Sequence, residues 1–224
     1  MSFIESDSHI GDFVDRRDAG RQLADHLLSL ADEHPVVVAL PRGGVPVARE
    51  VAMALGAPLE ILAVRKLGAP HNPEYGIGAL VEDGTRLIDA EAVAVLGITG
   101  GVLDSIIARE TAELRRRVDA YRDDCRPLEL KDRTIIVVDD GVATGVTDTA
   151  ALRALRHREP RRLILAVPVC AADTFRRLRG EADGIVCLLV PPLLHGVGKY
   201  YQDFSQVSDE DVVSVLGEFH IAAA

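Results

Sequence analysis

Two neighbouring carboxylates and a loop of small residues stand together in this sequence and could bind one ligand between them. Asp139 and Asp140 follow the apolar run TIIVV at 134–138, and the run GVATGVT follows them at 141–147. Adjacent carboxylates repel each other, so a fold that keeps them side by side must supply a cation, a hydroxyl-rich ligand or open water. The loop that comes next favours a ligand.

That loop has the composition of a phosphate-binding turn. Its glycines and alanine let the backbone turn closely around an anion, its threonines add hydroxyl donors, and a helix beginning near Thr147 would add unpaired N–H groups. Carboxylates accept hydrogen bonds from vicinal hydroxyls, so the acids and the loop together match a ribose with a 5′-phosphate. The predicted ribose- and phosphate-binding residues are Asp139, Asp140, Gly141, Val142, Ala143, Thr144, Gly145, Val146 and Thr147.

The run IIVVDDGVATGVT resembles the motif with which type I phosphoribosyltransferases bind 5-phosphoribosyl 1-pyrophosphate (PRPP). In that family an apolar strand is followed by two acids and a small, threonine-containing loop. The resemblance implies that Asp139 and Asp140 orient the ribose and act in catalysis, and that Mg²⁺ is a cofactor held through PRPP and water. The runs FVDRRDAGRQLADHLLSLA, RKLGAPHNPE and GKYYQDFSQVSDEDV also resemble a group of predicted bacterial phosphoribosyltransferases, which extends the likeness to most of the chain.

A second loop of the same kind lies earlier in the chain. In VVVALPRGGVPVARE, Pro41 and Arg42 come after an apolar run and before a helical pattern. Alone, this would read as an ordinary strand-to-helix turn. The resemblance implies that Arg42, Gly43 and Gly44 bind the pyrophosphate of PRPP, and that the peptide bond between Pro41 and Arg42 is cis. An arginine fork suits a pyrophosphate.

The segment 66–84, which we call the lid segment, is rich in glycine and proline and follows an apolar run that ends at Arg65 and Lys66. The resemblance implies a flexible loop that closes over the substrates and excludes water from a reactive sugar cation. Lys66 is predicted to help bind the pyrophosphate, although a solvated lysine at a strand end would look the same. His71 and Glu74 lie in the lid segment without an assigned role.

The residues after the last predicted strand, 191–224, form what we call the hood segment. It brings Tyr200, Tyr201 and Phe204 together in a chain that is only 4% aromatic. In related enzymes this region covers the acceptor, so these rings are candidates for stacking on a planar base. Packing of a C-terminal cap would explain the same cluster.

The elements that must position these residues alternate along the chain. Short β-branched runs at 36–40, 59–64, 134–138, 163–169 and 184–190 alternate with helical patterns, which indicates a parallel α/β sheet flanked by helices. A crossover helix is predicted to end at Gly56, and residues 101–126 read as an amphipathic helix whose arginines at 115–117 form a solvated face. Residues 1–224 are predicted to form a single type I phosphoribosyltransferase-like domain with a lid loop and a small hood.

Composition limits the partners and the cellular compartment that this sequence suits. The formal net charge of −10 argues against nucleic acid and anionic membranes as partners. No apolar run approaches the roughly 18 residues of a membrane span, and the first residues lack a signal-peptide pattern. Three cysteines, Cys125, Cys170 and Cys187, show no metal or disulfide spacing, which favours a reducing, cytoplasmic protein. A second copy of the chain, as a homodimer, is a candidate partner.

The acid pair also fits two other kinds of protein less well. A receiver domain with magnesium on the acids would need a further aspartate at a later strand end, and only the distant Asp173 is available. The glycine spacing fits neither a dinucleotide fingerprint nor a P-loop. The predicted function is PRPP-dependent phosphoribosyl transfer to a nitrogen acceptor, of nucleobase type by analogy alone, with release of pyrophosphate. A PRPP-sensing protein without turnover and a PRPP or nucleotide hydrolase remain open.

Overall fold

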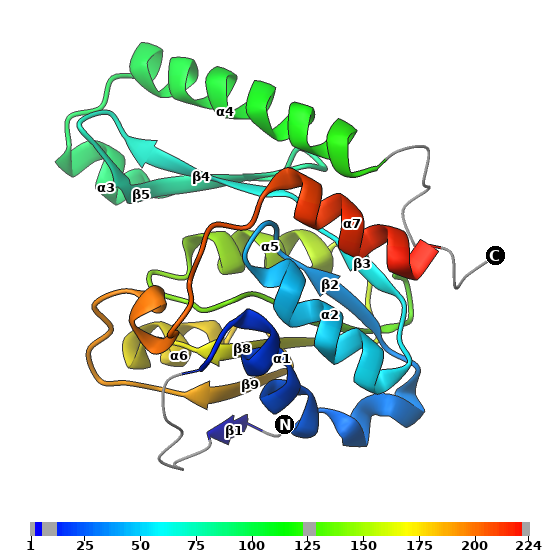
Figure 1. The fold of residues 1–224 in the computed structure, drawn as a ribbon. Helices are drawn as coiled ribbons and strands as arrows, with labels where there is room; N and C mark the ends of the chain where they lie inside the picture. Colours follow the sequence, from blue (N-terminus) through cyan, green and yellow to red (C-terminus); the bar gives the residue numbers. More distant parts are fainter. Residues whose placement is uncertain (1–2, 6–12, 123–128, 221–224) are drawn as a thin grey trace.

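The computed structural model describes residues 3–5, 13–122 and 129–220 (Figure 1). Their centre is a six-stranded parallel sheet with the strand order β1-β9-β8-β7-β2-β3. Successive strands are joined by helices, as parallel strands require. The strands are β1 (Phe3–Glu5), β2 (Val36–Ala39), β3 (Leu59–Ile61), β7 (Thr134–Val138), β8 (Arg162–Val169) and β9 (Gly184–Leu189).

Side chains of the central strands alternate between two apolar layers. In β7, Ile136 and Val138 pack into the layer under one set of helices, whereas Ile135 and Val137 pack into the layer on the opposite face. This alternation follows from the two-residue repeat of a strand, and burial of both faces explains why β7 is apolar throughout. The first layer lies under α1 (Arg16–Asp25), α2 (Gly44–Leu55) and α7 (Asp209–His220), and the second under α5 (Val146–Arg156) and α6 (Ala172–Leu178).

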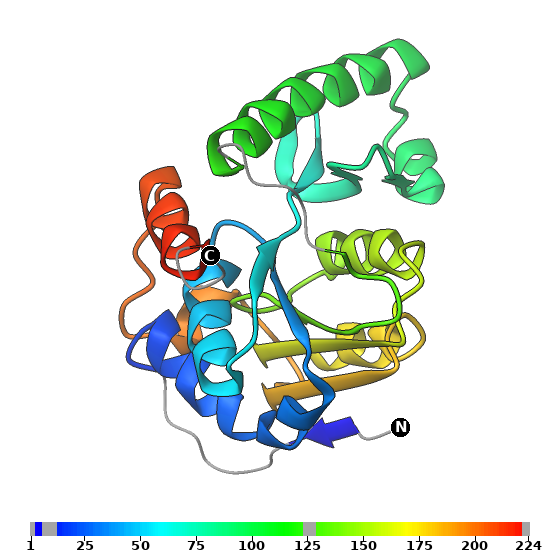
Figure 2. The ribbon, with the colours of Figure 1, turned by 90° about the vertical axis from the view of Figure 1, so that its right-hand side faces the viewer.

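A smaller antiparallel sheet stands beside the large one (Figure 2). It has the order β4-β5-β6, with β4 (Val64–Ala69), β5 (Asn72–Val81) and β6 (Arg86–Ile88). The long helix α4 (Gly100–Tyr121) and the short helix α3 (Ala90–Val95) cover it and share a separate apolar cluster with it. Two 3₁₀ turns, η1 (Leu28–Glu33) and η2 (Val197–Tyr200), complete the described elements.

The predicted parallel α/β fold is confirmed, and the predicted strands lie within a few residues of the observed ones. The predicted crossover helix is α2, which ends at Gly56 in the left-handed region with a φ of 58°. The amphipathic helix is α4, although it ends at Tyr121, five residues before the expected end. Arg116 and Arg117 both pair with Glu113, and the Arg116 side chain is 53% exposed, as a solvated face requires, whereas that of Arg117 is only 16% exposed.

The lid segment differs from the expected loop. Residues 66–84 form most of the β4–β5 hairpin, and the register between these strands shifts on both sides of Gly68. The glycines that suggested a loop instead allow close strand contact, because a Cβ on Gly68 would lie 2.4 Å from the carbonyl oxygen of Pro73. None of the helices in the described ranges is long and apolar enough to cross a membrane.

Candidate active site

The two anion loops leave the sheet side by side. β2 and β7 are parallel neighbours with Ala39 opposite Val138, and the Leu40 N–H donates to the Val138 carbonyl over 2.9 Å. Strand order reverses between β2 and β7, because β3 lies beyond one of them and β8 beyond the other. Ligands of open α/β sheets bind at such a switch point, beyond the carboxyl ends of the strands.

The loops also touch each other. A Cβ on Gly44 would lie 2.6 Å from the Val138 carbonyl oxygen and 2.9 Å from Cα of Asp139, so only glycine fits there. The peptide bond between Pro41 and Arg42 is cis, as expected. The acid pair and the predicted pyrophosphate loop therefore form one site.

A third carboxyl joins the acid pair. Asp148, in the first turn of α5, has only 3% of its surface exposed, and its Oδ1 receives no hydrogen bond from the described residues. Burial, followed by the charges of Asp140 and Asp148, raises the pKa of Asp139 well above its usual range. Burial likewise raises the pKa of Asp148 to about 7, and it raises the pKa of Asp140 as well. Three carboxyls thus share a poorly solvated site.

Arg16 supplies a positive charge to this cluster. Its Nε donates to Oδ2 of Asp140 over 2.8 Å, and the exposed fractions of the two side chains are only 11% and 14%. Its Nη1 donates to the Ser205 carbonyl over 2.8 Å, and its guanidinium lies 3.8 Å from the centre of the Phe204 ring. The start of α1 and the hood segment therefore converge on the acid pair.

The loop at 143–147 has the geometry of an anion cradle. Within the described part of the chain, the backbone N–H groups of these five residues donate to no acceptor. Two carbonyls of the loop are held from α6 instead: the Thr174 hydroxyl donates to Ala143 over 2.7 Å, and Arg177 donates to Thr144 over 2.7 Å. Gly145 has a φ of 70°, and α5 begins directly after it. Free amides at a helix start are suited to a phosphate.

The basic residues of the predicted pyrophosphate site lie on either side of it. Arg42 pairs with Asp209 at the start of α7, over 3.7 Å. Lys66 extends from β4 toward the phosphate loop, because its Cδ and a methyl group of Val146 both lie within 4 Å of the point where a Cβ on Gly76 would be. The structure therefore has Lys66 beside the start of α5, and it has Arg42 in the loop that follows β2.

The three hood aromatics have different surroundings. Tyr201 is buried between Phe13 and Phe204, with ring centres 5.3 and 5.0 Å away, and its hydroxyl donates to the Asp140 carbonyl over 2.6 Å. The Phe204 ring carries Arg16 on one face. Tyr200 packs partly buried against the core, and its carbonyl accepts from the Phe13 N–H. Tyr201 therefore supports the acid pair, and the faces of Tyr200 and Phe204 remain candidates for an acceptor.

Sequence reasoning missed five residues of the site: Arg16, Asp148, Thr174, Arg177 and Asp209. Arg16 lies in a run that was noted only for its family likeness, and Asp148 looks like an ordinary acid in the first turn of a helix. Asp173, the aspartate that a receiver domain would have to use, is 84% exposed on α6 and pairs with Arg176. Cys125 and the side chain of Glu74 lie outside the described residues, while Cys170 and Cys187 are buried thiols.

The side chains of the site decide how it could hold Mg²⁺, the ion that the sequence resemblance implies. Within the described ranges, no group of three or more histidine, cysteine, aspartate and glutamate side chains is arranged to hold a metal ion directly. Asp139 and Asp140 have carboxylate oxygens that can accept hydrogen bonds from metal-bound water. These residues fit an ion that is carried in by a phosphorylated ligand.

A parallel sheet whose switch point joins an acid pair, a phosphate cradle and a second anion loop defines a phosphoribosyltransferase fold. The family model described as "Phosphoribosyl transferase domain" matches residues 14–188, so the chain belongs to this family. Two Mycobacterium tuberculosis proteins, from strains CDC 1551 and H37Rv, carry provisional phosphoribosyl transferase names. Each is 43% identical to this chain over 208 residues, which is 93% of this chain and 47% of theirs. The chain thus spans about half the length of these curated relatives.

Two solved structures are similar to this one. TT1426 from Thermus thermophilus is 43% identical, with a TM-score of 0.78, over 93% of this chain and 99% of that one. AQ2163 from Aquifex aeolicus shares 13% identity and a TM-score of 0.50, over 82% of this chain and 78% of that one, which is a likeness of fold alone.

Proposed function

We propose that this protein transfers the phosphoribosyl group of PRPP to a nitrogen acceptor and releases pyrophosphate. The observation that carries the proposal is the contact between the two anion loops at the switch point, with the acid pair between them. PRPP has a 5′-phosphate, two ribose hydroxyls and a pyrophosphate in that order. The cradle at 143–147, the acids and the loop at Arg42 offer complementary groups in the same order.

In this proposal each group has one task. The amides of 143–147 bind the 5′-phosphate, and Asp139 and Asp140 accept hydrogen bonds from the ribose hydroxyls. Arg42 and the backbone of Gly43 and Gly44 bind the pyrophosphate, with Lys66 beside them. Bound Mg²⁺ would neutralise part of the charge on the leaving group.

The chemistry then depends on positioning and charge. The bond from C1 to the pyrophosphate oxygen breaks, positive charge develops on the sugar, and the nitrogen acceptor adds from the opposite face. In this proposal the carboxylates stabilise that charge. We further propose that the lid segment, as the β4–β5 hairpin, closes over this site as part of one catalytic unit, and that the hood segment covers the acceptor.

The proposal includes the cellular compartment of the protein. The two buried thiols, Cys170 and Cys187, suit a reducing compartment, and we infer that the protein works in the cytoplasm.

The test is a measurement of pyrophosphate release from PRPP with magnesium, with and without a panel of nucleobases and other amines. The proposal predicts release that depends on one acceptor, together with formation of its phosphoribosyl product. Release without any acceptor would instead identify a hydrolase. Tight PRPP binding with no turnover across the panel would identify a sensor.

A further inference from the structure

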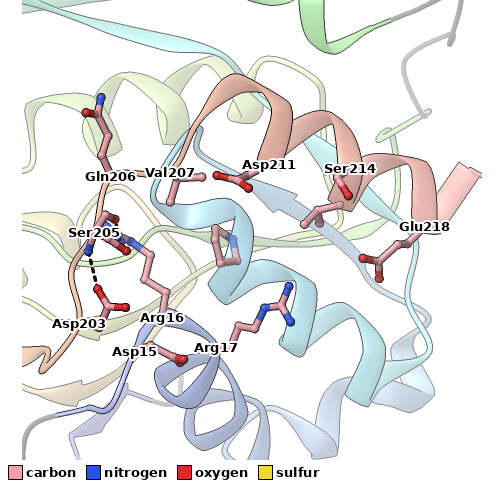
Figure 3. A pocket seen from close by; sticks show the side chains of 12 residues that line it. Asp15, Arg16, Arg17, Asp203, Ser205, Gln206, Val207, Asp211, Ser214 and Glu218 are labelled. Carbon is pink, nitrogen blue, oxygen red and sulfur yellow. Dashed lines mark hydrogen bonds between the residues drawn. The ribbon is translucent and has the colours of Figure 1, made fainter.

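Arg16 is held in place independently of the acid that it contacts. One nitrogen of its guanidinium is fixed by the Ser205 carbonyl and its face lies on Phe204, while a different nitrogen donates to Asp140. Figure 3 shows Arg16 extending from the start of α1 toward Ser205, while the next residue, Arg17, points away from it. Arg17 is exposed. Both arginines line one surface cavity, which has a volume of about 270 Å³.

More acidic than basic groups surround Asp140. From the loop after β7 and from α5 it is faced by Asp139 and Asp148, both carboxyls, and from the hood segment the neutral hydroxyl of Tyr201 donates to its backbone carbonyl. From the loop after β2 it meets Gly43, while Arg42 of that loop pairs with Asp209. Asp203 is a further acid in the field of Arg16. Among the described residues, Arg16 is the basic side chain that bonds to the acid cluster.

An ionised Asp140 is needed at the site proposed above, because a carboxylate accepts hydrogen bonds from hydroxyls more strongly than a protonated acid does. Burial beside other acids favours the protonated form, and a bonded guanidinium favours the ionised form. Arg16 occupies Oδ2 of Asp140 and, within the described part of the chain, leaves Oδ1 without a side-chain donor.

We propose that Arg16 is a positioning residue that keeps Asp140 ionised and oriented, so that Oδ1 is free to accept a hydroxyl of the ribose. This inference rests on the proposed function for the identity of the sugar. It gives Arg16, the middle residue of the DRR run at 15–17, a role at the ligand site, although Arg16 contacts Asp140 rather than the ligand. The Phe204 ring then acts as a platform for the guanidinium.

The first experiment needs no PRPP. Carboxyl ¹³C NMR of the full chain, with the Asp140 signal assigned through Asp140→Asn, follows the titration of Asp140 in the wild type, Arg16→Met, Arg16→Lys and Arg17→Met. The inference predicts a midpoint shifted to higher pH in Arg16→Met, largely restored in Arg16→Lys and unchanged in Arg17→Met. An unchanged midpoint in Arg16→Met would overturn it.

The second experiment measures binding of PRPP with magnesium by calorimetry across the neutral and alkaline range. Arg16→Met should bind roughly tenfold or more weakly than the wild type near neutral pH and recover as the pH rises. The ratio to wild type removes the titration of PRPP itself. Tighter binding by Arg16→Met would overturn the inference, because Arg16 would then compete with the ribose.

Two further results separate a failure of this inference from a failure of the proposed function or of folding. If the wild type does not bind PRPP, the proposed function fails, and the NMR titration still decides whether Arg16 controls Asp140. If Arg16→Met does not fold, Phe204→Leu keeps both charges and removes the ring that lies against Arg16 and that also packs on Tyr201. That variant should shift the Asp140 midpoint in the same direction by a smaller amount, and no shift would count against the inference.

Discussion

The backbone of Gly43 and the carboxylate of Asp140 lie in direct contact across the two anion loops. A Cβ at position 43 would stand 2.0 Å from Oδ2 of Asp140 and 2.5 Å from its Cγ. No real Cβ tolerates such a distance, so the carboxylate can take its observed position only because residue 43 is glycine. The same oxygen accepts from Arg16.

Gly43→Ala is therefore expected to displace the Asp140 side chain and to weaken binding of PRPP by tenfold or more, since about 1.4 kcal/mol corresponds to a factor of ten. The fold should survive, because the clash is with a side chain at the edge of the sheet. Calorimetric titration with PRPP and magnesium measures the effect.

Gly101→Ala is the matched control for that substitution. Gly101 lies in the first turn of α4, and a Cβ there meets no atom within 4 Å. Stability should stay the same or rise by up to about 1 kcal/mol, as for glycine replaced by alanine in a helix, and PRPP binding should not change. Equal binding by Gly43→Ala and the wild type would show that the carboxylate position is unimportant.

Asp148 is expected to make the stability of the protein depend on pH. Burial raises its pKa from 3.8 to about 7, so between those values the folded state holds a proton that the unfolded state has lost. The free energy of unfolding therefore falls as the pH rises from about 4 to about 7, by up to about 4 kcal/mol, and stays low above that.

Asp148→Asn should remove the part of this dependence that comes from Asp148, so the variant gains stability relative to the wild type as the pH rises through that window. Asp139 and Asp140, whose pKa values are also raised, still contribute in both proteins. Urea unfolding at several pH values measures the difference. A constant difference across the window would mean that Asp148 is ionised in the folded protein already at low pH.

Arg177 and Thr174 are expected to hold the phosphate cradle open. Thr174→Val removes one hydrogen bond to the loop, which is worth about 0.5–1.5 kcal/mol, and should weaken binding of inorganic phosphate accordingly. Arg177→Ala should weaken it further, because it removes both a hydrogen bond and a charge. Arg176→Ala, on the exposed side of α6, should have little effect. Loss of phosphate affinity in Arg176→Ala equal to that in Arg177→Ala would indicate a charge effect alone.

The turn of the lid hairpin should become less accessible when ligand binds. Residues 71–73 are exposed, and Tyr75 is 50% exposed. Limited proteolysis at 70–75 should slow with PRPP and magnesium, whereas cleavage at the exposed turn at 157–159, after α5, should not. Equal rates at 70–75 with and without saturating ligand would remove the reason to call this hairpin a lid.

The sequence predicted those parts of the site whose residues are close in the chain. The strand, acid pair and loop at 134–147 are contiguous, so local pattern indicated a ribose- and phosphate-binding run, whereas the loop around Arg42 looked like an ordinary turn and was assigned only through the family resemblance. That the two loops lie side by side is a finding of the structure, which has β2 and β7 as neighbours where strand order reverses.

The rest depends on contacts that local pattern does not encode. Arg16 and Asp140 are 124 residues apart, and nothing near either residue indicates the other. Asp148 was missed because an acid in the first turn of a helix is favourable in any surface helix, and nothing in the local sequence indicates the burial that the structure shows. The β4–β5 hairpin looked like a loop because Gly68 and Gly78 mark close backbone contacts, which in sequence resemble turn residues.

The most direct test of the account is the stabilisation of the protein by PRPP with magnesium, compared between the wild type and the double variant Asp139→Asn, Asp140→Asn. A ligand that binds only the folded state at about 100 times its dissociation constant adds roughly 2.7 kcal/mol, which is readily seen as a rise in melting temperature. We predict that the double variant folds, loses most of the stabilisation by PRPP, and keeps that by pyrophosphate with magnesium, since the loop at Arg42 is unchanged. If the double variant keeps the full stabilisation by PRPP, the carboxylates do not bind the ribose and the central claim is wrong.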